Sequence, residues 1–334
     1  PGRSLPGRAP LGRRPPLDDP SEHSGITVTN LPVLLGGHHD LAPIGDDIYR
    51  RIAHEQGTYL LEDLWDKFGD AKGIDIALLE SETTQGAIER IKQEAVKAAS
   101  EGSQLLVLTD RTVYDGDRRY LDPHLATSAI DQALKQIEVE PGEENLRRRC
   151  SIVLRSAAIR NVHDVVLALG LGANGVCPYV MVEVICVDDY PSDVANLCSA
   201  LRKGIEKVIS TIGIHEVRGY ARQFSSIGIK PELAEIFQTE AFAASESGGK
   251  GFAELDADTD ARQKILAGDE ESKPAKTFRF YPKVYKAAIA AANGTSTYDV
   301  YAEKVRELEA QSPISMRHVM NIRSDRDAIS PQDV

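Results

Sequence analysis

The stretch that decides the fold is CSIVLRSAAIRNVHDVVLALGLGANGVCPYVMVEVICV, residues 150–187. It begins with an apolar, β-branched run at 151–154, which predicts a buried strand. A second buried run at 175–177 ends at Pro178, which cannot donate a hydrogen bond to a sheet. Between the two runs, apolar residues recur at helical spacing: Ile159, Val162, Val166 and Leu169. Strand, helix and strand with short joins predict a βαβ unit, in which the two strands are parallel and covered by the helix.

The same stretch contains a pattern that suggests a nucleotide site. Gly170, Gly172 and Gly175 spell G-x-G-x-x-G, which in dinucleotide-binding sites follows a strand and begins a helix. Here the glycines follow a helix and lead into a strand, so no helix N-terminus faces a phosphate. We therefore interpret them as a helix end and a tight turn.

The composition is that of a globular protein, with 42% hydrophobic and 27% charged residues among 334. A net charge of -12 argues against nucleic acid or an anionic membrane as the main partner, and no apolar run is long enough to span a membrane. None of the four cysteines forms a C-x-x-C pair, and all lie in or beside apolar runs: Cys150, Cys177, Cys186 and Cys198. They predict buried free thiols, no metal site and a reducing, cytoplasmic location.

Strand and helix signals alternate through the first two thirds of the chain. Apolar runs at 74–79 and 104–108 predict strands, and a helix capped by Thr83 or Thr84 lies between them. Asp122-Pro123 predicts the beginning of a further helix, and a long amphipathic helix begins at Ser192. This alternation predicts a parallel α/β fold.

Four polar residues are candidates for a site. Asp110 and Arg111 follow a predicted strand at its C-terminal end, where α/β folds collect functional groups. We interpret them as a structural pair or loop anchor, because no third partner is evident. Arg160 and His163 lie in the central unit, where no serine or cysteine nucleophile is placed to use the histidine. The basic run 147–149 predicts a solvated face.

The chain divides by composition into four parts. Residues 1–25 form a tail rich in proline, glycine and arginine, which predicts disorder. Residues 26–242 carry the alternating pattern, and the Ser/Gly-rich and acidic stretch 243–276 predicts a linker. Residues 277–334 predict helices, at 284–292 and 298–309, without strands to cover, so this part is incomplete as a domain.

Several of these stretches together resemble the large subunit of glutamate synthase. The resemblance to its central domain rests on LLVLTDR (105–111), DPHLATSAI (122–130), Arg160, His163, LGLGANGVCPYVMVEVI (169–185), KVISTIGI (207–214), Tyr220 and IGI (227–229). FYPKVY (280–285), Met316-Arg317 and SDR (324–326) resemble the beginning of the FMN-binding synthase domain. The order and spacing of the stretches match the family, although no single motif decides it.

The resemblance implies an intact enzyme with an amidotransferase domain, a central domain, an FMN-binding β/α barrel and a C-terminal β-helix. It implies that this enzyme hydrolyses glutamine, passes ammonia inward and makes glutamate from 2-oxoglutarate. The electrons would pass through a 3Fe-4S cluster and FMN, supplied by a small subunit or domain. The amidotransferase domain, the FMN-binding strands and the cluster cysteines are absent from this sequence, so no catalytic, cofactor or metal residue can be carried over.

These observations predict a piece of glutamate synthase with a degenerate, barrel-like parallel β/α central domain and a truncated synthase domain. The resemblance implies a role as a connector that lines the ammonia passage, with Asp110, Arg111, Arg160 and His163 as interdomain or loop-anchoring groups. We expect the chain alone to bind no FMN. One alternative is an autonomous β/α-barrel enzyme, which would need a phosphate loop or an activated nucleophile. The other is a non-catalytic scaffold or gene remnant.

Overall fold

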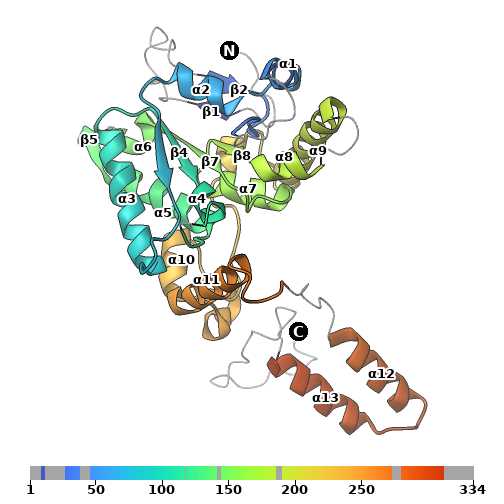
Figure 1. The fold of residues 1–334 in the computed structure, drawn as a ribbon. Coiled ribbons are helices and arrows are strands. Elements are labelled where there is room, and N and C mark those ends of the chain that lie inside the picture. Colours follow the sequence, from blue (N-terminus) through green and yellow to red (C-terminus); the bar gives the residue numbers. More distant parts are fainter. Residues whose placement is uncertain are drawn as a thin grey trace.

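In the computed structural model, the chain folds around a four-stranded parallel sheet (Figure 1). The structure describes residues 9–11, 27–37, 46–116, 118–140, 144–185, 190–272 and 280–311. The strands lie side by side in chain order: β3 (Lys72–Asp75), β4 (Leu105–Thr109), β7 (Ser151–Arg155) and β8 (Gly175–Cys177). Sequential parallel strands are the arrangement of a β/α barrel. The predicted barrel-like α/β fold is therefore confirmed, as an open sheet within the described residues.

Three helices connect the strands and cover one face of the sheet. They are α3 (Thr84–Ser100), α5 (Pro123–Gln136) and α7 (Val162–Gly170). Each begins after a residue whose side chain accepts hydrogen bonds from backbone N–H groups of the first turn: Thr83, Asp122 and Asn161. The caps predicted for α3 and α5 are confirmed, and α7 ends at the predicted Gly170.

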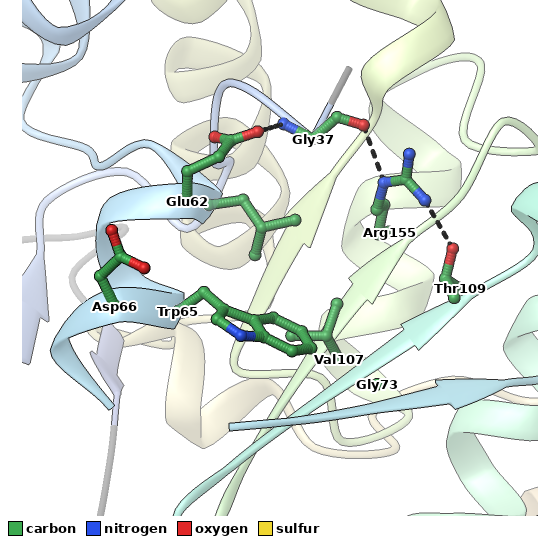
Figure 2. A pocket seen from close by; sticks show the side chains of 9 residues that line it. Gly37, Glu62, Trp65, Asp66, Gly73, Val107, Thr109 and Arg155 are labelled. Atoms are coloured by element: carbon green, nitrogen blue, oxygen red, sulfur yellow. Dashed lines mark hydrogen bonds between the residues drawn. The ribbon is translucent and has the colours of Figure 1, made fainter. Parts of the chain in front are cut away.

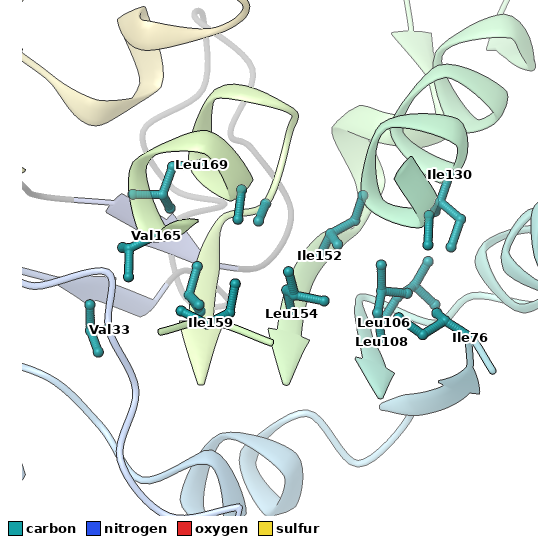
Figure 3. Packing of buried hydrophobic residues seen from close by; sticks show 14 of the residues in the cluster. Val33, Ile76, Leu106, Leu108, Ile130, Ile152, Leu154, Ile159, Val165 and Leu169 are labelled. Atoms are coloured by element: carbon teal, nitrogen blue, oxygen red, sulfur yellow. The ribbon is translucent and has the colours of Figure 1, made fainter. Parts of the chain in front are cut away.

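The main core lies between this sheet face and the connecting helices. Leu106, Leu108, Ile152 and Leu154 alternate along β4 and β7 toward the helices (Figure 3). Ile130 of α5 and Val165 of α7 pack against them. Ile159, which the sequence pattern placed in the helix, is fully buried in this core just before α7 begins.

A second core covers the opposite face. Leu105 and Val107 of β4 and Val153 of β7 point to this side, where Leu34 and helix α2 (Leu61–Lys67) cover them. Leu64, Phe68, Cys177 and Tyr179 also belong to this cluster. Both faces of β4 and β7 are therefore buried, which explains why their sequences read as continuous apolar runs rather than alternating ones.

Strand β3 differs from its prediction. The apolar run at 74–79 predicted a strand over its whole length, but β3 ends at Asp75. Leu78 instead pairs with Arg119 in an isolated antiparallel bridge. Ile76, Ala77 and Leu78 are still buried, and the Ile76 N–H donates to the Thr109 carbonyl at 3.0 Å. The apolar run therefore predicts burial correctly, although the strand ends before the run does.

The remaining elements surround this body. They are β2 (Thr27–Thr29), α1 (Asp46–Gln56), α4 (Arg111–Tyr114), β5 (Glu138–Glu140), β6 (Glu144–Asn145), α6 (Leu146–Arg149), α8 (Tyr179–Ile185), α9 (Tyr190–Thr211), the 3-10 turns Val217–Tyr220 and Phe242–Gly248, and α10 (Pro231–Phe237). None of the helices in the described ranges combines the length and apolar character that a membrane crossing requires.

Two segments contain structure where the sequence predicted none. In the predicted tail, β1 (Ala9–Leu11) pairs antiparallel with β2, while the rest of residues 1–25 lies outside the described residues. In the predicted linker, residues 252–266 form α11 (Phe252–Leu266). The Asp256 carboxylate of α11 accepts a hydrogen bond from the Thr84 N–H at 2.7 Å, and the Thr259 hydroxyl donates to the Tyr120 carbonyl at 2.9 Å. This part of the predicted linker is therefore bonded to the central body.

The last described elements form a helical hairpin. Helices α12 (Phe280–Ala292) and α13 (Tyr298–Gln311) lie side by side, apart from the sheet in Figure 1. Helices were predicted for both stretches. Met316-Arg317 and residues 324–326 lie outside the described residues, and the domain boundaries near 25, 242 and 276 stay predictions.

Candidate functional site

Sheet register brings four side chains into one row at the carboxyl end of the sheet. Asp75, Thr109, Arg155 and Cys177 are partners across β3, β4, β7 and β8. Because partners in adjacent parallel strands point to the same face, the row lies above the face that α2 covers. In β/α folds this end carries the functional groups.

Asp110, the residue after β4, is a buried acidic group at this end. Its side chain is buried, and its carboxylate accepts a hydrogen bond from the Ser156 hydroxyl at 2.5 Å and two from the Ala157 N–H at 3.1 and 3.2 Å. The Tyr179 hydroxyl donates at 3.4 Å. Burial raises the pKa of Asp110, and the bond from Ser156 opposes that rise only in part. These bonds hold the ends of β4, β7 and β8 together.

Arg155 lies beside this cluster and is held from three directions. Its Nε donates to the Gly37 carbonyl at 2.8 Å, and its Nη1 donates to the Thr109 hydroxyl at 2.8 Å (Figure 2). Its guanidinium carbon lies 4.6 Å from the centre of the Tyr179 ring, within the range of a cation–π contact. The Gly37 N–H in turn donates to Glu62 of α2 at 2.6 Å. Arg155 therefore links the sheet to the segment that covers it.

A cleft of about 420 Å³ lies between α2 and the sheet next to Arg155. Its lining residues are Gly37, Leu61, Glu62, Trp65, Asp66, Gly73, Val107, Thr109 and Arg155. Figure 2 shows the acidic residues of α2 on one side and Arg155 with Thr109 on the other. The cleft is thus apolar in its floor and charged at its two sides.

The structure brings only one of the four predicted residues into this arrangement. Asp110 lies in the buried cluster, while Arg111 forms an ion pair with Asp115 at 3.3 Å rather than with Asp110. Arg160 is exposed and its Nε lies 3.4 Å from the Asp164 carboxylate. His163 is exposed, and its backbone N–H donates to Asn161 in the cap of α7. Among the described residues, no contact joins Arg160 or His163 to Asp110.

Sequence reasoning missed Arg155, Ser156 and Tyr179. The signal was available in part, because Arg155 and Ser156 end β7 just as Thr109 and Asp110 end β4. The rule that functional groups follow parallel strands applies equally to both strands. Tyr179 follows β8, the second strand of the predicted βαβ unit, so the same rule applied to it.

The described residues offer little to a metal or to flavin. They contain no group of three or more His, Cys, Asp or Glu side chains that could hold a metal ion. Burial raises the pKa of the Cys177 thiol to about 12, so this thiol stays protonated and weakly nucleophilic. The predicted buried thiols are confirmed for Cys150, Cys177 and Cys198, while Cys186 lies outside the described residues.

A site for the FMN phosphate needs free backbone N–H donors, and the nearest candidates lie in the loop after β7. The Ala157 N–H is bonded to Asp110 and the Ala158 N–H to the Ser156 hydroxyl. The Arg160 N–H is bonded to Asp164. These three N–H groups are therefore already bonded within the protein and do not fit the role of free donors to an FMN phosphate.

A second polar cluster lies at the amino-terminal end of the sheet. Asp131 of α5 is bonded to Arg147 at 2.8 Å, Lys135 at 2.6 Å and Arg222 at 3.0 Å. Arg147 also donates to the Cys150 carbonyl, the Gly172 carbonyl and the Asn174 side chain. The prediction that 147–149 form a solvated face is wrong for Arg147, which is 5% exposed, because Asp131 supplies a buried counter-charge.

Two glycines of the G-x-G-x-x-G pattern pack closely against this cluster and the nearby core. A Cβ on Gly170 would lie 2.8 Å from the Tyr220 ring. Gly172 has φ +119°, and a Cβ there would lie 2.4 Å from the carboxyl carbon of Asp131. Such a backbone angle and such close approaches favour glycine. Packing thus accounts for Gly170 and Gly172 of the pattern without a nucleotide.

The comparisons with known proteins agree with the sequence resemblance. The model of the family described as glutamate synthase central domain matches residues 13–230. The chain is 34% identical to glutamate synthase [NADH] of Schizosaccharomyces pombe over 175 residues, which cover 48% of this chain and 8% of that protein. It is 27% identical to the glutamate synthase [NADPH] large chain of Bacillus subtilis over 276 residues, which cover 78% of this chain and 17% of that one.

The chain therefore spans less than a fifth of the length of these curated relatives. Among solved structures, a flavocytochrome b2 variant with sulfite bound is 21% identical, with a TM-score of 0.34 over 48% of this chain and 36% of that chain. A similarity this low says nothing about function.

Proposed function

Because this chain belongs to the family of glutamate synthase central domains, we propose that it is the connecting body of a glutamate synthase. The intact enzyme would make L-glutamate from glutamine-derived ammonia and 2-oxoglutarate, with FMN and a 3Fe-4S cluster in parts beyond this chain. The body would hold the amidotransferase and FMN domains of the same polypeptide in register and contribute walls to the ammonia passage. We place the enzyme in the cytoplasm.

One observation carries the proposal that the body is not itself catalytic. The Asp110 carboxylate at the carboxyl end of the sheet is enclosed by internal bonds from Ser156, Ala157 and Tyr179. A catalytic carboxylate must reach a substrate, whereas Asp110 is 1% exposed. Its bonds instead fix neighbouring strands to one another, which suits a rigid spacer.

The packing of the body supports its role as a wall for ammonia. Both faces of β4 and β7 are covered by apolar side chains, so this part of the fold excludes water. A passage for ammonia needs such a wall, because ammonia that escaped into water would not be used for glutamate synthesis. We infer that residues 26–242 form the wall and that α12 and α13 begin the following domain.

A chimera tests the connecting role. Residues 27–272 of this chain would replace the matching part of the Bacillus subtilis large chain, and glutamate formed would be measured against glutamine hydrolysed. We expect the ratio to stay close to that of the parent enzyme. A matched chimera carrying Asp131→Ala, which disrupts the buried charge cluster, should lower the ratio. Equal ratios in a folded Asp131→Ala chimera and its parent chimera would contradict the connecting role.

A simpler measurement tests the absence of a flavin site. The purified full chain should show no flavin absorbance after incubation with FMN and desalting, and should form no glutamate from glutamine and 2-oxoglutarate. Retention of one FMN per chain would overturn the proposal of a non-catalytic body. If the chimera loses the parent ratio of glutamate to hydrolysed glutamine and the chain alone binds no FMN, the connecting role is contradicted. The chain would then be a scaffold or gene remnant without an enzyme partner.

A further inference from the structure

The cleft beside Arg155 has features of a ligand site that the connecting role does not require. Its floor and wall are apolar, formed by Leu61, Trp65 and Val107. The Trp65 ring lies over Gly73, where its Cη2 would be in ordinary contact, at 3.4 Å, with an added Cβ. Ligand sites are commonly apolar clefts with a few placed polar groups.

Arg155 and Thr109 line the polar end of the cleft. Arg155 is held through Nε, Nη1 and its contact with Tyr179, while its Nη2 has no hydrogen-bond partner among the described residues. The Thr109 oxygen accepts bonds from Arg155 Nη1 and from the Arg111 N–H at 3.3 Å. Since both acceptor positions of this hydroxyl are used, its hydrogen is left to donate. A fixed guanidinium with a neighbouring hydroxyl donor suits a carboxylate.

The opposite side of the cleft is acidic. Glu62 and Asp66 of α2 are exposed, and neither forms an ion pair with a described residue. One oxygen of Glu62 accepts from the Gly37 N–H, which leaves its other oxygen without a partner in the described chain. Figure 2 shows both carboxylates across the cleft from Arg155. Two negative charges would repel a dicarboxylate and attract an ammonium group.

We propose that this cleft binds a free α-amino acid with an apolar side chain. The amino acid's carboxylate would bind Arg155 and Thr109, its ammonium would face Glu62 and Asp66, and its side chain would lie against Trp65. A zwitterion is the ligand that matches one fixed cation on one side and two carboxylates on the other. The site lies at the carboxyl end of the sheet but does not use the sealed Asp110 cluster.

Ligand binding in this cleft can be followed by the fluorescence of Trp65. Trp65 is the only tryptophan in the sequence, so intrinsic tryptophan fluorescence of the full chain reports on the cleft alone. The probe is L-leucine, with isocaproate, which lacks the amine, and isoamylamine, which lacks the carboxylate. We expect a saturable change with L-leucine and binding roughly tenfold or more weaker with either analogue, as lost charged hydrogen bonds imply. The assay uses no catalysis, so its result is independent of the connecting role.

Three variants locate the binding. Arg155→Gln should weaken L-leucine binding by roughly tenfold to a hundredfold. Glu62→Gln keeps an oxygen for the Gly37 N–H, and should weaken L-leucine binding without weakening isocaproate binding. Glu80→Gln removes an exposed carboxylate outside the cleft and should change neither. If Arg155→Gln fails to fold, as judged by circular dichroism, Glu62→Gln decides the test.

The proposal fails if millimolar L-leucine leaves the fluorescence unchanged. It also fails if isocaproate binds as tightly as L-leucine, which would make the acidic side irrelevant. Equal weakening by Glu62→Gln and Glu80→Gln would likewise overturn it, because the effect would then come from net charge alone.

Discussion

Two aspartates at opposite ends of the sheet are both buried, but their carboxylates are bonded by different kinds of partner. Asp110, at the carboxyl end, is 1% exposed, and Asp131, near the amino-terminal end, is 2% exposed. Asp110 is bonded by neutral donors, the Ser156 and Tyr179 hydroxyls and a backbone N–H. Asp131 is bonded by three cationic side chains. A buried carboxylate needs partners in either case.

The difference between them appears in the direction of their pKa values. Burial raises the pKa of Asp110, and its neutral partners do not reverse the rise. Burial also acts to raise the pKa of Asp131, but the charges of Arg147, Lys135 and Arg222 outweigh it and lower the pKa. The buried carboxylate at the carboxyl end therefore has a raised pKa, while the one at the other end has a lowered pKa. We expect the stability of the fold to depend mainly on the second.

The largest effect should come from Asp131→Ala. Loss of the carboxylate leaves Arg147 buried without its counter-charge, and breaking such a pair costs about 3–5 kcal/mol of the free energy of unfolding. Urea denaturation followed by circular dichroism measures this cost. The double variant Asp131→Leu/Arg147→Met should regain much of the loss, because it leaves no buried charge at these two positions. A single variant within about 1 kcal/mol of the parent protein would show that the cluster contributes little.

Gly172→Ala should have the next largest effect, because it acts on the same cluster through the backbone. Positive φ costs an alanine about 1–3 kcal/mol, and the new Cβ must also displace the Asp131 carboxyl. Gly102→Ala is the matched control, with φ +106° and no atom within 4 Å of the added Cβ. The control should show the strain alone. If both variants lose the same stability in urea, contact with Asp131 is not a constraint.

Asp110→Asn should have the smallest effect near neutral pH, about 1 kcal/mol, since asparagine keeps an oxygen for the Ala157 N–H. The pH dependence is the sharper test. A raised pKa in the folded state means that Asp110 contributes most stability below its ordinary pKa of 3.8 and loses it as the pH rises through the folded value. The stability gap between the parent protein and the variant should therefore shrink from acid to neutral pH. A gap that widens toward neutral pH would contradict the assigned direction.

For Asp131 we expect the opposite dependence of stability on pH. Its lowered pKa contributes stability above its ordinary value of 3.8 that is lost as the pH falls through the folded value. Comparing Asp131→Ala with Asp110→Asn over one pH series therefore separates the two ends of the sheet by the sign of their slopes. This comparison needs no assumption about the function of either end.

The sequence by itself determined the features that depend on neighbours along the chain. The apolar runs at 104–108, 151–154 and 175–177 identified β4, β7 and β8, because a buried strand needs little beyond its own side chains. The Thr83 and Asp122 caps located two helices, because a cap bonds to N–H groups two or three residues away. The order of glycines relative to the helix excluded a nucleotide loop for the same local reason.

Only the tertiary structure decided which charges are buried and which side chains share a site. Arg147 and Arg160 look alike in the sequence, yet one meets Asp131 in the core and the other lies in solvent. The row from Asp75 to Cys177 spans more than 100 positions of the chain and exists because strand register aligns it. The composition of residues 243–276 predicts a linker, whereas α11 is held by contacts with Thr84 and Tyr120, far away along the chain. Burial and strand register depend on residues far apart in the chain, and the composition of a short stretch of sequence does not identify those residues.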